Sequence, residues 1–189
     1  MPPSLTTRIV GGDFAGTGLA EPERRADVEL LHMHYALHTA CTLVWAAMAD
    51  AHTGSGRHED EQAGDPALNL IDQFHTHVSQ IHSPARLVWV LEAAFTITRV
   101  FPPNTPAAVH VTPLASLHHL RRFLAVVQTA AERVLNGAPS SEGAAVAVSR
   151  ADHVKREAEE AIWRLCLATR LRAMAATKGV RGGEESGWA

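Results

Sequence analysis

The amino-acid sequence predicts an all-α fold: a single-domain helical bundle with flexible N- and C-terminal tails. Three observations lead to this prediction. Residues 30–49 are rich in helix-forming side chains and contain no Asp, Glu, Lys, Arg, Gly or Pro. A helix-capping residue followed by proline recurs at three later points. Alternation of apolar and polar residues, which is typical of strands, is limited to the short segment 107–111.

The composition is that of an ordinary globular protein. The chain has 189 residues, of which 46% are hydrophobic and 20% charged. With 17 basic and 20 acidic side chains it lacks the basic character of a nucleic-acid-binding domain. Its two cysteines have no C-x-x-C spacing, and residues 1–12 do not match a secretory signal. We therefore expect a cytoplasmic protein with no nucleic-acid partner.

Three regions are expected along the chain. Residues 1–22 combine several prolines and glycines with little apolar periodicity, which predicts a flexible N-terminal arm. The bundle domain is expected to span residues 23–179. A flexible C-terminal tail is then expected over residues 180–189.

Residues 30–49 are expected to form the buried central helix of the bundle. Asp27 is placed to cap its start, and apolar residues line two of its faces, one through Leu37 and the other through Trp45. Its length alone would allow a membrane span. However, its three histidines, its tyrosine and its two threonines would each lose their water in lipid. We therefore predict a soluble bundle with no membrane partner.

Asp65 and Pro66 form the first cap-then-proline signal and predict the start of the next helix. The second signal, Ser83-Pro84, opens a segment at 85–101 that is either a separate helix or a kinked continuation of the preceding one. The bundle therefore has either five helices or four long ones, one of them kinked. The apolar positions expected to be buried before this break are Leu70, Ile71, Phe74, Val78 and Ile81.

Thr112-Pro113 is the third signal, and it predicts a helix that ends at Asn136-Gly137. A loop is expected over residues 138–148, where a proline and a glycine disfavour helix. The residues that this helix is expected to bury are Leu117, Leu120, Leu124, Val127 and Val134.

The last helix is expected to begin at Ser149, which with Asp152 resembles a capping box, and to run to about Thr177 before Gly179. On its outer face the spacing of basic and acidic residues predicts ion pairs four positions apart. These pairs are Lys155 with Glu159 and Arg156 with Glu160.

Twelve histidines suggest one kind of chemistry, a divalent metal site inside the bundle. His34 and His38 are four residues apart, so they share a helical face and could meet one ion. With one of His75 or His77 from the next helix, and with Glu92 as a carboxylate ligand, they form the predicted ligand set. Burial of His34 and His38 would also make stability fall as the pH drops through about 6.5.

The sequence also argues against this metal site. A di-iron bundle needs two Glu-x-x-His pairs, and the chain has one, Glu29 with His32; His32 itself is expected at the surface. No His-Glu-x-x-His motif is present. Glu92 is then expected to pair with Arg121 or Arg122, because a buried carboxylate needs a cationic partner.

Three classes of function remain open, and the sequence assigns no specific biochemical activity. The first is a non-enzymatic interaction or regulatory protein, forming a homodimer through spare apolar faces of the helices that begin at Ala85 or Ser149. The second is a metal-binding bundle acting as a hydrolase or transferase. The third is a small-ligand pocket lined by Trp45, Trp89 and histidines. The lack of a complete catalytic set favours the first class.

Overall fold

A computed structural model of the chain describes residues 21–53, 65–100, 114–137 and 142–184. Within these ranges every regular element is a helix, which confirms the all-α prediction. The helices are α2 (Glu21–Thr53), α3 (Pro66–Ser79), α4 (Pro84–Val100), α6 (Leu114–Gly137) and α7 (Glu142–Glu184).

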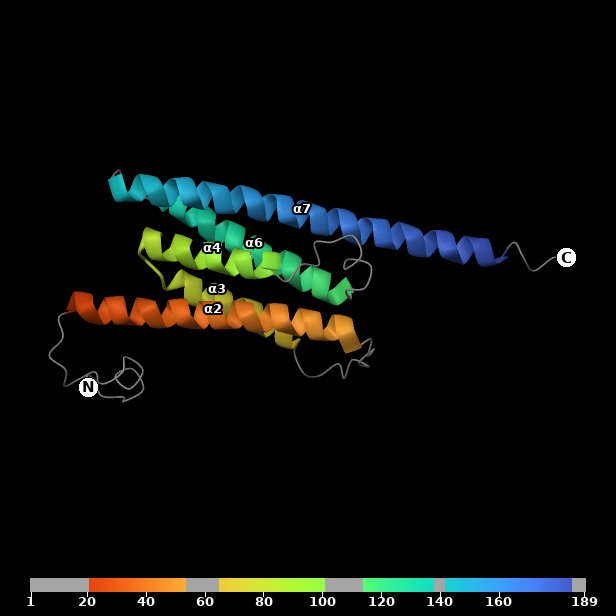
Figure 1. Cartoon of the computed structure of the whole chain (residues 1–189), viewed down its shortest axis with the longest axis horizontal. Helices are drawn as coiled ribbons and strands as arrows, with labels where there is room; N and C mark the ends of the chain where they lie inside the picture. Colours follow the sequence, from red (N-terminus) through yellow and green to blue (C-terminus); the bar gives the residue numbers. More distant parts are fainter. Residues whose placement is uncertain (1–20, 54–64, 101–113, 138–141, 185–189) are drawn as a thin grey trace.

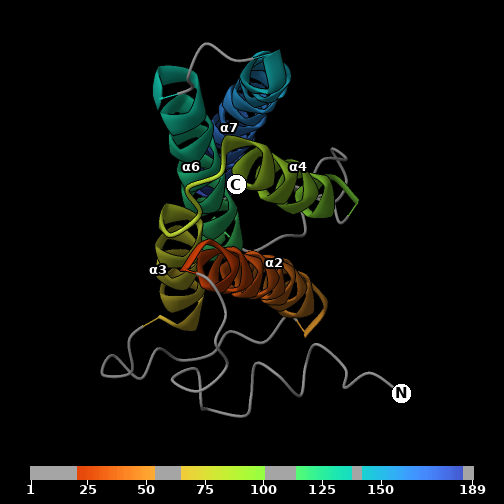
Figure 2. The ribbon, with the colours of Figure 1, turned by 90° about the vertical axis from the view of Figure 1, so that its left-hand side faces the viewer.

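The helices form two closely packed pairs, which are joined by α4 and by direct contacts of α6 with α2 and α3. The most extensive packing is between α6 and α7, followed by that between α2 and α3. Helix α4 packs against α2, α6 and α7, and the end-on view shows it between the two pairs (Figure 2). Helix α6 packs against all four of the other helices, so it is the most central of the described helices.

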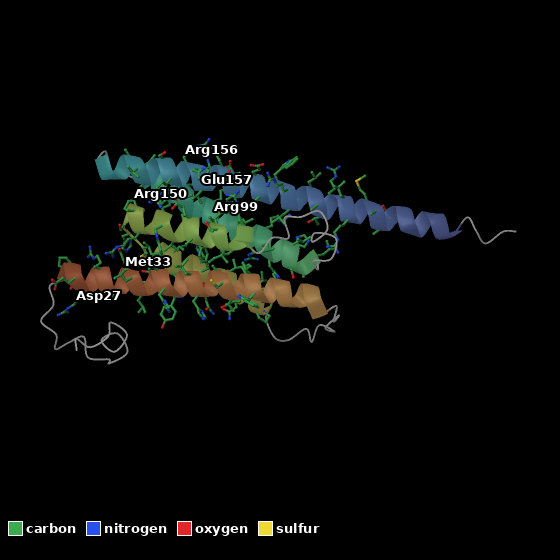
Figure 3. The ribbon with its side chains drawn as sticks, viewed as in Figure 1. Asp27, Met33, Arg99, Arg150, Arg156 and Glu157 are labelled. Carbon is green, nitrogen blue, oxygen red and sulfur yellow. The ribbon has the colours of Figure 1, made fainter. Side chains whose placement is uncertain are left out.

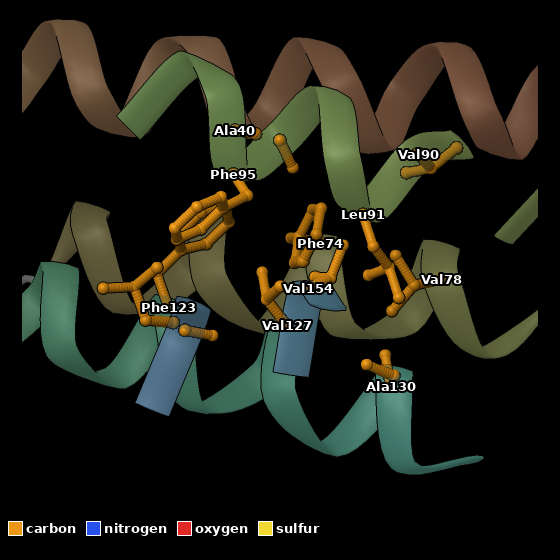
Figure 4. Packing of buried hydrophobic residues seen from close by; sticks show 14 of the residues in the cluster. Ala40, Phe74, Val78, Val90, Leu91, Phe95, Phe123, Val127, Ala130 and Val154 are labelled. Atoms are coloured by element: carbon orange, nitrogen blue, oxygen red, sulfur yellow. The ribbon is translucent and has the colours of Figure 1, made fainter. Parts of the chain in front are cut away.

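Both predicted apolar stripes lie in the core. Ile71, Phe74, Val78 and Ile81 are buried, Leu70 is partly buried, and all five residues predicted for α6 are buried. The ring centroids of Phe74 and Phe123 lie 4.7 Å apart, so this pair of side chains joins α3 to α6 (Figure 4). The 3.6-residue period of the sequence identified these faces because each helix buries one continuous side.

The start of α3 follows the predicted signal. Asp65 is its capping residue, and Oδ1 of Asp65 accepts a hydrogen bond of 2.9 Å from the backbone N–H of Ala67. Pro66 occupies the first turn, where a missing N–H costs nothing. Oδ2 of Asp65 lies 2.6 Å from Nε2 of His119, so the same carboxylate also contacts α6.

Ser83-Pro84 is a turn between two separate helices. α3 ends at Ser79 and α4 begins at Pro84, because the residue before a proline is disfavoured in helical conformation. The guanidinium of Arg133 on α6 donates to the carbonyl oxygens of Val78, Ser79 and Ile81 at 2.6, 3.3 and 3.1 Å. These bonds satisfy carbonyl groups that the end of α3 leaves open. In the described residues the break at Ser83-Pro84 is therefore a turn between two helices, and not a kink in one.

The prediction of a loop over residues 138–148 was wrong from residue 142 onward. α7 begins at Glu142, well before Ser149. Ala144, Ala147 and Ala151 are buried at helical spacing, and the stripe continues through Val154 and Ala158. Burial of this alanine face outweighs the modest cost of Gly143 in a helix. The helix also continues past Gly179, which was expected to end it.

The expectations for α2 also needed correction. The helix begins at Glu21, so Asp27 lies inside it and does not cap its start. It is peripheral and not central: one face is buried, whereas Leu30, Tyr35 and Trp45 are 46 to 62% exposed. The buried side of α2 includes Ala36, Ala40, Leu43 and Val44. Three parts of the expectations lie outside the described residues: the Thr112-Pro113 start, residues 1–20 of the arm expected at 1–22, and residues 185–189 of the tail expected at 180–189.

Candidate functional site

The structure does not bring the predicted metal ligands together. His34 and His38 are both exposed on α2, which contradicts their expected burial and the pH effect derived from it. His75 is exposed on α3, and Glu92 on α4 is held by an arginine of α7. Among the side chains that the structure describes, no group of three or more His, Cys, Asp or Glu is arranged to hold a metal ion.

Glu92 pairs with Arg150, and not with Arg121 or Arg122 as expected. Nε of Arg150 donates to Oε1 of Glu92 at 2.8 Å, and Nη2 contacts the second carboxylate oxygen. The hydrogen bonds with Glu92 raise the pKa of Arg150. Arg99 of α4 lies 3.4 Å from a carboxylate oxygen of Glu157 on α7, so two ion pairs join these helices (Figure 3).

A histidine pair that the sequence did not suggest lies between α2 and α3. Nδ1 of His32 lies 3.1 Å from Nδ1 of His77, and the ring of Tyr35 stacks on His77 with centroids 5.4 Å apart. Burial, and secondarily the neighbouring His32, lower the pKa of His77. One of the two rings can donate to the other only when the acceptor ring is neutral. No local pattern could have identified this pair, because its members are 45 residues apart.

Glu29 is a buried acid with a structural partner. Oε2 of Glu29 lies 2.9 Å from Nη1 of Arg86, and Oε1 accepts a hydrogen bond of 3.3 Å from the backbone N–H of His82. Arg86 also donates to the carbonyl oxygen of Ala26 at 3.2 Å. The Glu29-x-x-His32 pair of the sequence is thus divided between two clusters. Glu29 joins α2 to the α3–α4 turn, and His32 contacts α3.

The two tryptophans predicted to line a ligand pocket do not enclose one. Trp45 is 62% exposed on α2, and Trp89 is 48% exposed on α4. A cleft of about 350 Å³ lies between α3 and α6, and its lining includes His75 and Arg133 but neither tryptophan. Arg133 is already bonded to the end of α3, so this cleft lies beside a structural contact.

The clearest binding feature is an apolar surface on α7, here called the α7 stripe. It is formed by Trp163, Leu167, Leu171 and Met174, whose exposed fractions are 64, 41, 54 and 50%. Their spacing of four, four and three residues places them on one helical face.

The α7 stripe lies where α7 leaves the bundle. Leu165 is the last buried residue of α7 in the part of the helix whose side chains are described. The C-terminal part of α7 extends past the ends of the other helices (Figure 1). Trp163 and Leu165 are two positions apart and so point to nearly opposite sides of the helix. The stripe therefore faces away from the bundle core. The sequence indicated apolar faces on this helix, but only the packing distinguishes the buried face from the exposed one.

Comparisons of the chain with protein families, curated proteins and solved structures gave no match. In the described helices there is no stretch long and apolar enough to cross a lipid bilayer. The described part of the chain is a helical bundle whose last helix, α7, projects from it and carries an uncovered apolar face.

Proposed function

We propose that this protein is a non-enzymatic interaction protein that binds another polypeptide helix through the α7 stripe. The observation that carries the proposal is the exposure of Trp163, Leu167, Leu171 and Met174 in one row on the side of α7 opposite Leu165, the last buried residue described in this helix. Burial of a fully exposed apolar side chain contributes about 1.5 to 3 kcal/mol, and roughly half of that is available for each of these four, which are already partly covered. A partner that covers all four side chains would therefore gain enough free energy for specific binding.

Helix stability supports the same proposal. Most of the stability of a helix in a protein comes from the packing of its apolar face against other elements, and not from intrinsic helix propensity. The segment of α7 beyond Leu165 has no buried side chain among its described residues, so the bundle contributes little to holding it helical. A helix that binds along the α7 stripe would supply the missing packing.

The proposed location is the cytoplasm. Cys41 on α2 and Cys166 on α7 are both free thiols, and Cys166 is exposed. Reducing compartments keep such thiols in this state.

The experiment that tests the proposal is site-specific photocrosslinking in cells that produce the full chain. A photoreactive phenylalanine analogue replaces Leu171 in the stripe; the matched control carries it at Val146, an equally apolar residue of α7 that is 60% exposed outside the stripe. If the proposal is correct, the analogue at position 171 forms a defined crosslink to a polypeptide and the analogue at position 146 forms none. Mass spectrometry then identifies the partner peptide. Equal labelling at both positions, or none at 171, would contradict it.

A further inference from the structure

We infer that His32 of α2 and His77 of α3 form a binding site for one divalent metal ion of the late first transition row, with Nδ1 of each imidazole as a ligand. This site is separate from the α7 stripe, so it goes beyond the proposed function. Of the metal ligands that the sequence predicted, only His77 takes part. Its partner, His32, was expected at the surface, and the packing of α2 against α3 brings the two together.

The distance between the two Nδ1 atoms fits a shared metal ion. Nδ1 of His32 and Nδ1 of His77 lie 3.1 Å apart. An imidazole nitrogen binds Zn²⁺ at about 2.0 to 2.1 Å, so two such nitrogens on one ion lie about 2.8 to 3.4 Å apart for angles of about 90 to 110° at the metal. The observed distance falls within this range. An ion can therefore take the place of the hydrogen bond between the rings without a change in the separation of the two helices.

Aromatic contacts hold the two rings in position. His32 and Tyr35 are three residues apart on α2, so they share a face of the helix, and both contact His77. The Tyr35 ring stacks on the His77 ring at an interplanar angle of 22°, and the ring of His34 packs edge-on against Tyr35 with centroids 5.7 Å apart. Ligands that are held in place before the ion arrives lose less conformational freedom when it binds.

The pair is accessible to an ion from solvent. His32 and His77 are both half-buried, and Tyr35 is 46% exposed. At about pH 7.5 an imidazole with the ordinary pKa of about 6.5 is mostly neutral, which is the form that binds metals. Catalytic zinc sites have three protein ligands, so a site with two leaves more positions to water, and we expect moderate affinity.

The ligand type selects the class of ion. Imidazole nitrogen favours Cu²⁺, Ni²⁺ and Zn²⁺, whereas Mg²⁺ and Ca²⁺ favour oxygen ligands. Among the side chains that the structure describes, no Asp, Glu or Cys joins the two histidines in a group of three. We therefore expect Ni²⁺ and Zn²⁺ to bind at this site and Mg²⁺ not to bind.

A bound ion would link two helices through residues that are 45 positions apart in the chain. Because the unfolded chain does not hold the two rings together, the ion binds the folded state preferentially and shifts the folding equilibrium towards it. At a free ion concentration of about 100 times the dissociation constant, the equilibrium constant for folding rises about 100-fold.

The first test is urea denaturation of the full-length chain without a histidine tag, at about pH 7.5, with and without Ni²⁺. Ni²⁺ should stabilise the wild type, and His77→Gln should reduce the Ni²⁺-dependent rise in the folding constant about tenfold or more. The matched control is His75→Gln, a change at an exposed histidine of the same helix, which should keep the full effect. Circular dichroism without metal checks that each variant is folded.

A second control concerns the exposed histidines of α2. His34 and His38 are four residues apart on one helical face and are themselves placed to hold an ion. Such an ion would contact α2 alone and would not link two helices. His38→Gln removes this pair, and we expect it to keep the stabilisation by Ni²⁺.

The second test needs no substitution. In the wild type, a substoichiometric amount of paramagnetic Ni²⁺ should broaden the imidazole NMR signals of His32 and His77 before those of the other histidines. This measurement decides the matter even if His77→Gln fails to fold.

The two tests distinguish the site from other modes of binding. Stabilisation that is lost in His77→Gln and kept in both controls, with His32 and His77 broadened first, supports the site. Stabilisation that is lost in His38→Gln, or first broadening at His34 and His38, places the ion on α2 alone and overturns it. The absence of any stabilisation by Ni²⁺, an equal effect in all variants, or an equal effect of Mg²⁺ also overturns it.

Discussion

Replacing Arg86 with methionine would leave the carboxylate of Glu29 buried without its cation. The side chain of Glu29 is 8% exposed and that of Arg86 is 33% exposed, so the acid is more desolvated than the base. Loss of one partner of a fully buried pair costs about 3 to 5 kcal/mol. Partial exposure of Arg86 admits water to the carboxylate, so we expect Arg86→Met to lower the free energy of unfolding by about 2 kcal/mol.

The matched variant is the double substitution Glu29→Met, Arg86→Met. It removes both charges and keeps similar apolar volume, so it should be less destabilising than Arg86→Met alone. The His82 N–H would lose its acceptor at Glu29, which keeps the expected cost of the double variant above zero. Urea denaturation followed by circular dichroism measures all the free energies of a double-mutant cycle.

The test compares the two losses in the free energy of unfolding: Arg86→Met should lose more than the double variant. The physical reason for the larger loss in Arg86→Met is the uncompensated buried charge, which the double variant no longer contains. If Arg86→Met were the less destabilising of the two, or if it cost under about 0.5 kcal/mol, the side chain of Glu29 would be solvated and the reasoning would be refuted.

Three further predictions concern the packing. First, the folded pKa of His77 is lowered, so folding disfavours its protonation; its contribution is complete above about pH 6.5 and is lost as the pH falls through its folded pKa. Thermal melts from about pH 8 to 5 should show this loss in wild type and less of it in His77→Gln, and equal slopes would contradict it. Second, Phe74→Ala should cost about 3 to 5 kcal/mol in urea denaturation, because Phe74 is fully buried against Phe123; a cost under about 1 kcal/mol would mean that the core collapses around the cavity. Third, Ala151→Leu should cost about 1 to 3 kcal/mol by overpacking the buried alanine face of α7, whereas Ala145→Leu on the exposed side of the same helix should stay within about 0.5 kcal/mol.

The periodicity of the sequence predicted which residues of a single helix are buried. It did not predict which side chains of different helices contact each other. Each helix of a bundle buries one face, so the positions of Ile71, Phe74 and Val78 follow from spacing alone. The arginine that pairs with Glu92 depends on where α7 crosses α4, which no local pattern encodes. The same holds for His32 and His77, which come from two helices. The i,i+4 histidines suggested a metal site only because spacing on one helix was the available signal.

The sequence by itself determined the helical class, the cap at Asp65, the break at Ser83-Pro84 and the buried faces of α3 and α6, because these depend on the backbone and on neighbours within one or two turns. The tertiary structure decided which apolar face of each helix is covered. The uncharged stretch at 30–49 is peripheral because α3, α4 and α6 pack against one side of α2 and leave the side with Leu30, Tyr35 and Trp45 exposed. The α7 stripe is exposed because it lies on the side of α7 opposite Leu165, and a hydrophobic face is buried only where another element packs against it.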